Sequence, residues 1–176
     1  MTNSVVSIIT PTYNHERFIG KCIESVLDQS SSEWEMIIVD DESTDNTESV
    51  VRRYDDPRIT YIRQNHVGPY RMNETYNRAL DRARGEYIAV LEGDDLWPKN
   101  KLERQLSFIA DHPEAVACYG RAGMIDNRGE SVGLYSAPEC DSDVATTRDF
   151  VLRRSAVQPV TVIIRHNVLS AIGGFI

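Results

Sequence analysis

The stretch that decides the fold runs from residue 86 to residue 98 and reads Glu86-Tyr87-Ile88-Ala89-Val90-Leu91-Glu92-Gly93-Asp94-Asp95-Leu96-Trp97-Pro98. Its first half is a continuous apolar run, which is typical of a strand buried on both faces of a parallel sheet. An acidic turn follows the run, and Pro98 then predicts the start of a helix. The stretch therefore predicts a strand, a turn and a helix of an open α/β sheet.

The acidic turn brings Glu92, Asp94 and Asp95 close together. Carboxylates at this spacing repel one another unless a cation or hydrogen bonds hold them. Ligands of open α/β sheets bind beyond the carboxyl ends of the strands, which is where this turn lies. The sequence has neither of the common glycine-rich phosphate loops. We hypothesise that the turn holds Mg²⁺ or Mn²⁺, which prefer such oxygen ligands, and that the cation holds a phosphate.

Strand and helix patterns alternate around this stretch. Apolar and β-branched runs predict strands at 5–10, 34–39, 59–62, 86–91 and 115–119. Apolar residues at helical spacing predict helices at 16–29, 44–53, 72–83 and 98–111, with Ser43 or Thr44 capping the second and Gly85 ending the third. This alternation predicts a mostly parallel sheet with helices on both faces.

The regular alternation ends near Gly120. Residues 126–129 predict a hairpin or a long turn. Further on, the pattern predicts a helix at 145–152, a strand at 160–164 and a short helix at 167–172. We expect this part to add a smaller antiparallel element to the first sheet.

Composition limits the class of protein. The chain has 176 residues, of which 41% are hydrophobic and 26% charged, as expected for one globular domain. A net charge of -8 argues against general nucleic-acid binding. No apolar run approaches the ~20 residues of a transmembrane helix. The scattered cysteines, Cys22, Cys118 and Cys140, lack metal-ligand spacing, so we expect free thiols in a reducing cytoplasm.

Polar turns also follow the first two predicted strands, at residues 11–14 and 40–43. In a parallel sheet they would lie at the same edge as the acidic turn. Tyr13 offers an aromatic face on which a base can stack. Asp40 or Asp41 offers an acceptor for an imide N–H or a ribose hydroxyl. With a metal-bound diphosphate, these groups would form a nucleotide-diphosphate site. Each turn alone has an ordinary explanation, because Asp, Asn, Ser and Gly are common turn and cap residues.

Several segments share their order and spacing with a known family: 6–14, 22–29, 38–45, 83–88 and the pair Asp94-Asp95. Over roughly residues 5–110 they resemble family 2 glycosyltransferases. The resemblance implies a Rossmann-like GT-A fold, with residues 1–120 as the nucleotide-sugar-binding half of a single domain. Residues 121–176 would be the incomplete start of the acceptor-side half, and residues 172–175 are similar to an acceptor-side segment of these enzymes.

The resemblance also implies roles for individual residues. Pro11 and Tyr13 would flank the base, and Asp41 would contact the base edge. Arg71 would lie near the diphosphate, although a solvated helix charge is the ordinary reading of that residue.

In the acidic turn, Asp94 and Asp95 would bind Mn²⁺ or Mg²⁺, and Asp94 would also contact the nucleotide-sugar. Glu92 stands where the family usually has Asp, and a glutamate reaches one methylene further.

The reaction implied is transfer of a sugar, with inversion, from a nucleotide-diphosphate donor to an acceptor hydroxyl. We expect a UDP-sugar as the donor and a glycan or a lipid-linked acceptor in polysaccharide or cell-surface glycan synthesis. The expected location is the cytoplasm, with peripheral association at the inner face of the membrane. No residue of the chain fits the catalytic base, which we expect beyond Ile176, so that this chain would bind donor but transfer sugar poorly.

Two other classes share parts of this pattern. A sugar nucleotidyltransferase also uses acidic turns and a metal, but it needs a glycine-rich, basic loop where this chain has residues 11–15. A phosphoacceptor receiver domain, which is not an enzyme, needs its acidic pair after the first strand and a lysine after the fifth. Here the pair follows the second strand, and no lysine follows Tyr119.

Overall fold

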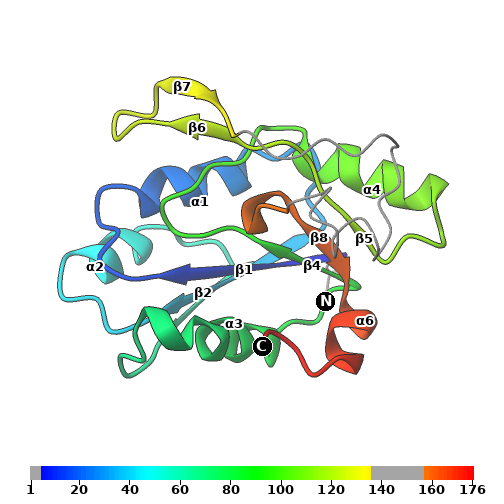
Figure 1. Ribbon diagram of the computed structural model, residues 1–176. Helices are drawn as coiled ribbons and strands as arrows, with labels where there is room; N and C mark the ends of the chain where they lie inside the picture. The colour runs from blue at the N-terminus through cyan, green and yellow to red at the C-terminus, as the bar shows by residue number, and fades with distance from the viewer. Residues whose placement is uncertain (1–4, 136–156) are drawn as a thin grey trace.

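A six-stranded sheet forms the centre of the molecule. Its strands are β1 (Val6–Thr12), β2 (Trp34–Asp40), β3 (Ile59–Arg63), β4 (Tyr87–Val90), β5 (Ala117–Cys118) and β8 (Ile163–Arg165). The computed structural model describes residues 5–135 and 157–176, and the strand order is β3-β2-β1-β4-β8-β5 (Figure 1). The first four strands run parallel, whereas β8 is antiparallel to β4 and β5. The predicted mostly parallel sheet with a late antiparallel element is confirmed.

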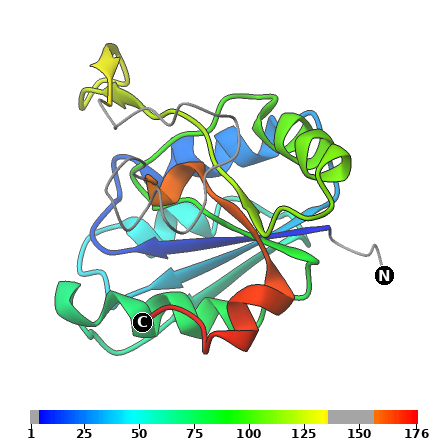
Figure 2. The same cartoon turned by 45° about the vertical axis from the view of Figure 1, so that its right-hand side comes forward.

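Helices cover both faces of the sheet (Figure 1 and Figure 2). They are α1 (Ile19–Leu27), α2 (Thr47–Val51), α3 (Met72–Leu80), α4 (Lys101–Asp111) and α6 (His166–Ala171), with the 3-10 turns η1 (Pro69–Arg71) and η2 (Pro159–Thr161). One apolar cluster joins α1, α2 and α4 to the sheet, and a second joins α3 and α6 to its other face. In the described parts of the chain, no helix is long and apolar enough to cross a membrane.

The apolar strands explain this layering. Successive side chains of a strand point to opposite faces, so Ile8 packs under α1 while Ile9 packs against α3. Both are fully buried, as the continuous apolar run predicts. Because the strand ends are held from both faces, the turns that follow them have fixed positions.

A small hairpin extends from the sheet layer over α1, as both views show (Figure 1 and Figure 2). It consists of β6 (Gly123–Ile125) and β7 (Ser131–Leu134). Asp126 accepts hydrogen bonds from the N–H groups of Arg128 and Glu130 and thereby closes the turn. The predicted hairpin is confirmed, whereas the helix predicted at 145–152 lies outside the described residues.

Several predicted boundaries are wrong for identifiable reasons. The helix expected from Pro98 begins at Lys101, because Pro98 starts a turn that the Lys101 N–H closes on its carbonyl at 3.0 Å. The same carbonyl accepts from the Gln29 side chain at 2.8 Å. The strand expected at 160–164 is β8, at Ile163–Arg165, because η2 occupies the preceding residues and its proline offers no N–H to a ladder.

The expected helix cap and stop are also wrong. Ser43 accepts a hydrogen bond from the Asn14 N–H and does not cap α2. Gly85 does not end α3, which stops at Leu80. A Cβ on Gly85 would lie 2.6 Å from the backbone nitrogen of Ser7, so the glycine permits the chain to enter β4 close to β1. Of the cysteines, Cys22 and Cys118 are free thiols, as predicted, and Cys140 lies outside the described residues.

Candidate active site at the strand ends

The carboxyl ends of β1, β2 and β4 meet at one edge of the sheet. Thr12 pairs with Asp40 in the register of β1 and β2, and the Asp41 N–H donates to the Thr12 carbonyl at 2.9 Å. On the other side of β1, the Gly93 N–H donates to the Pro11 carbonyl at 3.0 Å. The structure thus brings together the three polar turns that the sequence placed at one edge.

An aromatic pair lies at the end of β1. The Tyr13 side chain is 41% exposed, while Pro11 before it is buried. The imidazole of His66 lies against the Tyr13 ring, with 4.7 Å between the centroids and 33° between the planes. A flat, partly exposed surface of this kind suits stacking with a base. His66 was not among the site residues predicted from the sequence, because no local pattern signals a contact between the end of β1 and the loop after β3.

The two acids at the end of β2 have different surroundings. Asp40 is fully buried and accepts hydrogen bonds from the Ser43 N–H at 2.7 Å and the Tyr61 hydroxyl at 2.6 Å. Its carboxylate therefore shapes the turn. Asp40, one of the two residues considered as acceptors for a donor molecule, is committed to the protein's own groups.

Asp41 organises the loop of residues 64–68. Its carboxylate accepts from the Gln64 side chain at 2.8 Å and from the Val67 and Gly68 N–H groups at 2.9 and 3.0 Å, and it lies 2.9 Å from Nδ1 of His66. Burial alone would raise the pKa of Asp41, but these hydrogen bonds and the His66 ring hold it below its usual value. Asp41 thereby sets the position of the ring that faces Tyr13.

In the acidic turn, carboxylates face one another. Glu92 accepts a hydrogen bond from the Tyr76 hydroxyl at 2.6 Å. Burial raises the pKa of Asp95 to about 7, together with the neighbouring Glu92 carboxylate and the charge of Asp94. A cation would remove the reason for this shift, because it favours the ionised carboxylates.

His15 and Gly93 fix the acidic turn against β1. Nε2 of His15 lies 3.9 Å from Oδ2 of Asp94, and its Nδ1 lies 3.2 Å from Oγ1 of Thr12. A Cβ on Gly93 would lie 2.6 Å from Oγ1 of Thr12 and 2.8 Å from Nδ1 of His15. Only glycine therefore allows the turn to approach this closely. His15 was also missed, although its place just after Tyr13 is a signal that could have found it.

A cavity of about 600 Å³ opens beside the acidic turn. Glu92, Asp94 and Asp95 line one side, and the β6–β7 hairpin lines another. Arg17, just before α1, and Lys21, in its first turn, add positive charge to the cavity wall. The cavity therefore has the size and the mixed polarity of a small-molecule site.

The carboxylates of the acidic turn suit a cation that is also coordinated by the phosphates of a bound substrate. In residues 5–135 and 157–176, no group of three or more His, Cys, Asp or Glu side chains forms a metal cage. Mg²⁺ usually takes only one or two protein carboxylates and completes its shell with phosphates and water. Asp94 and Asp95 fit that pattern, and their role as metal ligands stays a prediction.

Arg71 is not directed at the acidic turn. Its guanidinium pairs with Glu74 on the exposed surface, with Nη2 at 2.7 Å from Oε2. The contact predicted between Arg71 and a diphosphate stays a prediction.

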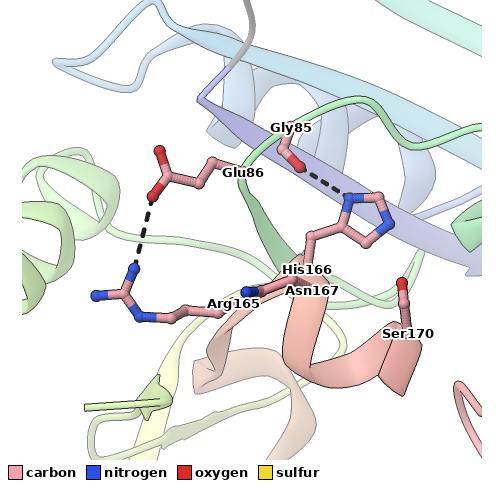
Figure 3. A pocket seen from close by; sticks show the side chains of 6 residues that line it. All are labelled: Gly85, Glu86, Arg165, His166, Asn167 and Ser170. Atoms are coloured by element: carbon pink, nitrogen blue, oxygen red, sulfur yellow. Dashed lines mark hydrogen bonds and ion pairs between the residues drawn. The ribbon is translucent and has the colours of Figure 1, made fainter. Parts of the chain in front are cut away.

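A second hollow of about 480 Å³ lies at the opposite end of β4 (Figure 3). There Glu86 and Arg165 face one another, and Nδ1 of His166 donates a hydrogen bond to the Gly85 carbonyl at 2.9 Å. None of the predicted site residues lines it. The chemistry predicted from the sequence is therefore concentrated at the carboxyl edge of the sheet.

The sequence matches the model of the family described as Glycosyl transferase family 2 over residues 7–169. The chain belongs to this family. This membership confirms the resemblance that the sequence motifs indicated. It rules against the two alternatives considered from the sequence, a sugar nucleotidyltransferase and a phosphoacceptor receiver domain. The matched range includes the two acidic turns and the late strand β8.

Two curated relatives of this family 2 chain show the same relationship. A glucosyltransferase of Escherichia coli, named UDP-Glc:alpha-D-GlcNAc-diphosphoundecaprenol beta-1,3-glucosyltransferase WfgD, is 34% identical over 97% of the chain. TuaG of Bacillus subtilis, whose name assigns it to teichuronic acid biosynthesis, is 39% identical over 93% of the chain. The chain spans 64% of the length of each relative.

Solved structures confirm the GT-A fold. TarS of S. aureus, in complex with UDP-GlcNAc, superposes with a TM-score of 0.77 at 27% identity, over 97% of this family 2 chain and 48% of TarS 1-349. The mannosyltransferase PcManGT of Pyrobaculum calidifontis, in complex with GDP-Man and Mn²⁺, gives 0.71 at 24% identity over 98% of the chain and 47% of that protein. At the latter identity, the likeness concerns the fold alone.

Proposed function

We propose that the chain forms the donor-binding part of a glycosyltransferase, which moves a sugar from a nucleotide diphosphate to an acceptor hydroxyl. The observation that carries the proposal is the meeting of an aromatic pair, Asp41 and an acidic turn at one edge of the sheet. The acidic turn lines a cavity of about 600 Å³, whereas the aromatic pair and Asp41 lie outside its lining. A UDP-sugar is the favoured donor, in line with the UDP-GlcNAc complex of TarS and the UDP-Glc named for WfgD.

Each part of the edge has a role in this proposal. Pro11 and the Tyr13 ring flank the base, and Asp41, which holds the loop that closes the base side, contacts the base edge. Asp94 and Asp95 hold Mn²⁺ or Mg²⁺. Such a cation, when bound, stabilises the negative charge that develops on the leaving diphosphate.

The proposed transfer inverts the configuration at the sugar. The acceptor hydroxyl attacks from the face opposite the leaving diphosphate, helped by a general base. The acceptor is a glycan or a lipid-linked sugar of a cell-surface polysaccharide, and the reaction takes place at the cytoplasmic side of the membrane. In this proposal the chain supplies the donor side of the reaction.

Thermal unfolding with UDP and MnCl₂ tests the proposal. A ligand at 100 times its Kd stabilises the folded state by about 2.7 kcal/mol. For a chain of this length, that gain raises the Tm by about 5–10 °C. GDP and dTDP in parallel would identify the base, and UDP with EDTA would separate the metal-dependent part. If a folded sample responds to no nucleotide diphosphate with metal, the proposed function is wrong.

A further inference from the structure

Helix α3 connects the two acidic turns. Oγ1 of Thr75 accepts a hydrogen bond from the Gln64 side chain at 2.8 Å, and the same amide donates to Asp41 at 2.8 Å. The next residue, Tyr76, donates its hydroxyl to Oε1 of Glu92 at 2.6 Å. Two successive residues of one helix therefore support the base side and the metal side of the site.

The same helix also holds the C-terminal segment, which lies beside it in Figure 1. The Asn77 side chain donates to the Phe175 carbonyl at 2.8 Å and accepts from its N–H at 2.9 Å. The Phe175 ring stacks on Tyr76, with 4.9 Å between the centroids and 27° between the planes. Gly174 has a φ of 86°, a left-handed conformation that favours glycine and brings Phe175 onto the helix.

The length of the Glu92 side chain allows its carboxylate to reach Tyr76 on α3. Oε1 of Glu92 accepts from the Tyr76 hydroxyl, and the charge of the same carboxylate acts on Asp95. The Glu92 side chain thus reaches from the acidic turn to α3, and an aspartate is one methylene shorter. Without the tyrosine hydroxyl, the Glu92 carboxylate would be free to turn within a site that already holds Asp94 and Asp95.

We propose that Tyr76 is a positioning residue of the donor site, which fixes Glu92 beside the Asp94–Asp95 pair and is itself fixed by Phe175. This inference rests on the proposed function, because it assigns Tyr76 to the metal-dependent part of donor binding. It gives the Gly173-Gly174-Phe175 segment a direct structural link to the acidic turn.

The test is calorimetric titration of wild type and Tyr76→Phe with UDP in MnCl₂, and with UMP in EDTA. The variant keeps the ring that stacks on Phe175 and loses only the hydroxyl. A hydrogen bond to a charged acceptor corresponds to roughly a tenfold change in affinity, so we expect UDP in MnCl₂ to bind about tenfold more weakly. Binding of UMP in EDTA should not change, because Tyr13 and Asp41 are untouched.

Tyr61→Phe is the matched control. It removes a tyrosine hydroxyl that donates at the same distance, 2.6 Å, to Asp40 in the other turn. We expect it to lower the Tm without changing the Mn²⁺ concentration at half-saturation. A loss of stacking in Phe175→Leu should raise the Kd for UDP in MnCl₂ by about threefold, and this variant carries the test if Tyr76→Phe does not fold.

The outcomes separate the two proposals. If wild type binds UDP with MnCl₂ and Tyr76→Phe binds it equally well, the positioning role is overturned and the proposed function stands. If wild type binds no nucleotide diphosphate with metal, both are overturned. A loss of UMP binding in EDTA by Tyr76→Phe would show a general structural role and would also overturn the inference.

Discussion

Two acidic turns lie at neighbouring parts of the same sheet edge, and they differ in what surrounds their carboxylates. After β2, Asp40 and Asp41 accept hydrogen bonds from the protein's own N–H, amide and hydroxyl groups. After β4, Glu92, Asp94 and Asp95 lie close to one another, and burial with this crowding raises the pKa of Asp95 to about 7. Similar residues therefore build a frame in one turn and crowd together in the other, where we propose that a cation binds.

The difference shows how an acidic cluster can be interpreted. A carboxylate whose lone pairs are occupied by backbone donors contributes to stability, because removing it leaves those donors unpaired. Carboxylates that lack donors and repel one another cost stability until a cation arrives. The predictions below test whether the two turns divide stability and metal binding between them.

The largest expected effect is on metal-dependent binding. Asp95→Ala should abolish the part of the UDP-induced stabilisation that depends on MnCl₂, which for wild type is up to about 2.7 kcal/mol at 100 times Kd. Thermal unfolding with UDP in MnCl₂ and in EDTA measures this difference. Survival of the Mn²⁺-dependent part would place the metal site elsewhere.

A smaller but still large effect is expected on stability from the other turn. Asp41→Ala leaves the donors of Gln64, Val67 and Gly68 without their acceptor, so the free energy of unfolding should fall by about 2–4 kcal/mol. Urea unfolding in EDTA measures it. Asp94→Ala is the matched control, because the Asp94 side chain is 53% exposed, and its effect should stay within about 0.5 kcal/mol. Equal losses in both variants would contradict the division of roles.

The loss of folding stability at low pH should depend on Asp41. Its pKa in the fold lies below the value of about 3.9 for an unfolded Asp. Its stabilisation is therefore present above about pH 4 and is lost as the pH falls through the pKa in the fold. In Asp41→Asn the urea midpoint should fall less steeply with acid than in wild type. Parallel curves between pH 3 and pH 7 would show that other groups cause the loss of stability at low pH.

The smallest effect is expected at Arg71. Its ion pair with Glu74 lies on the exposed surface, so Arg71→Ala should leave the Tm in EDTA unchanged. The informative measurement is the Kd for UDP in MnCl₂. Weaker binding by Arg71→Ala would support the predicted contact with the diphosphate, whereas an unchanged Kd would remove Arg71 from the site.

Local patterns predicted the strands well but their ends less well. Residues 86–91 read as a buried strand and form β4, because a continuous apolar run has few alternatives. The starts of α4 and β8 were misplaced by several residues, because turns at Pro98 and Pro159 precede them. Ser43 was predicted as a helix cap but accepts from the Asn14 N–H instead, since this partner lies in the turn after β1, distant in sequence.

The sequence by itself determined the parallel sheet, the family and the edge at which Tyr13, Asp41, Asp94 and Asp95 lie. Periodicity and motif spacing are local properties, and strand ends of a parallel sheet share one edge whatever the helices do. Only the tertiary structure decided how the two acidic turns differ. The donors to Asp41 come from the loop after β3, and the partner of Glu92 comes from α3. Such contacts depend on packing between segments that are distant in sequence, and no local pattern records them.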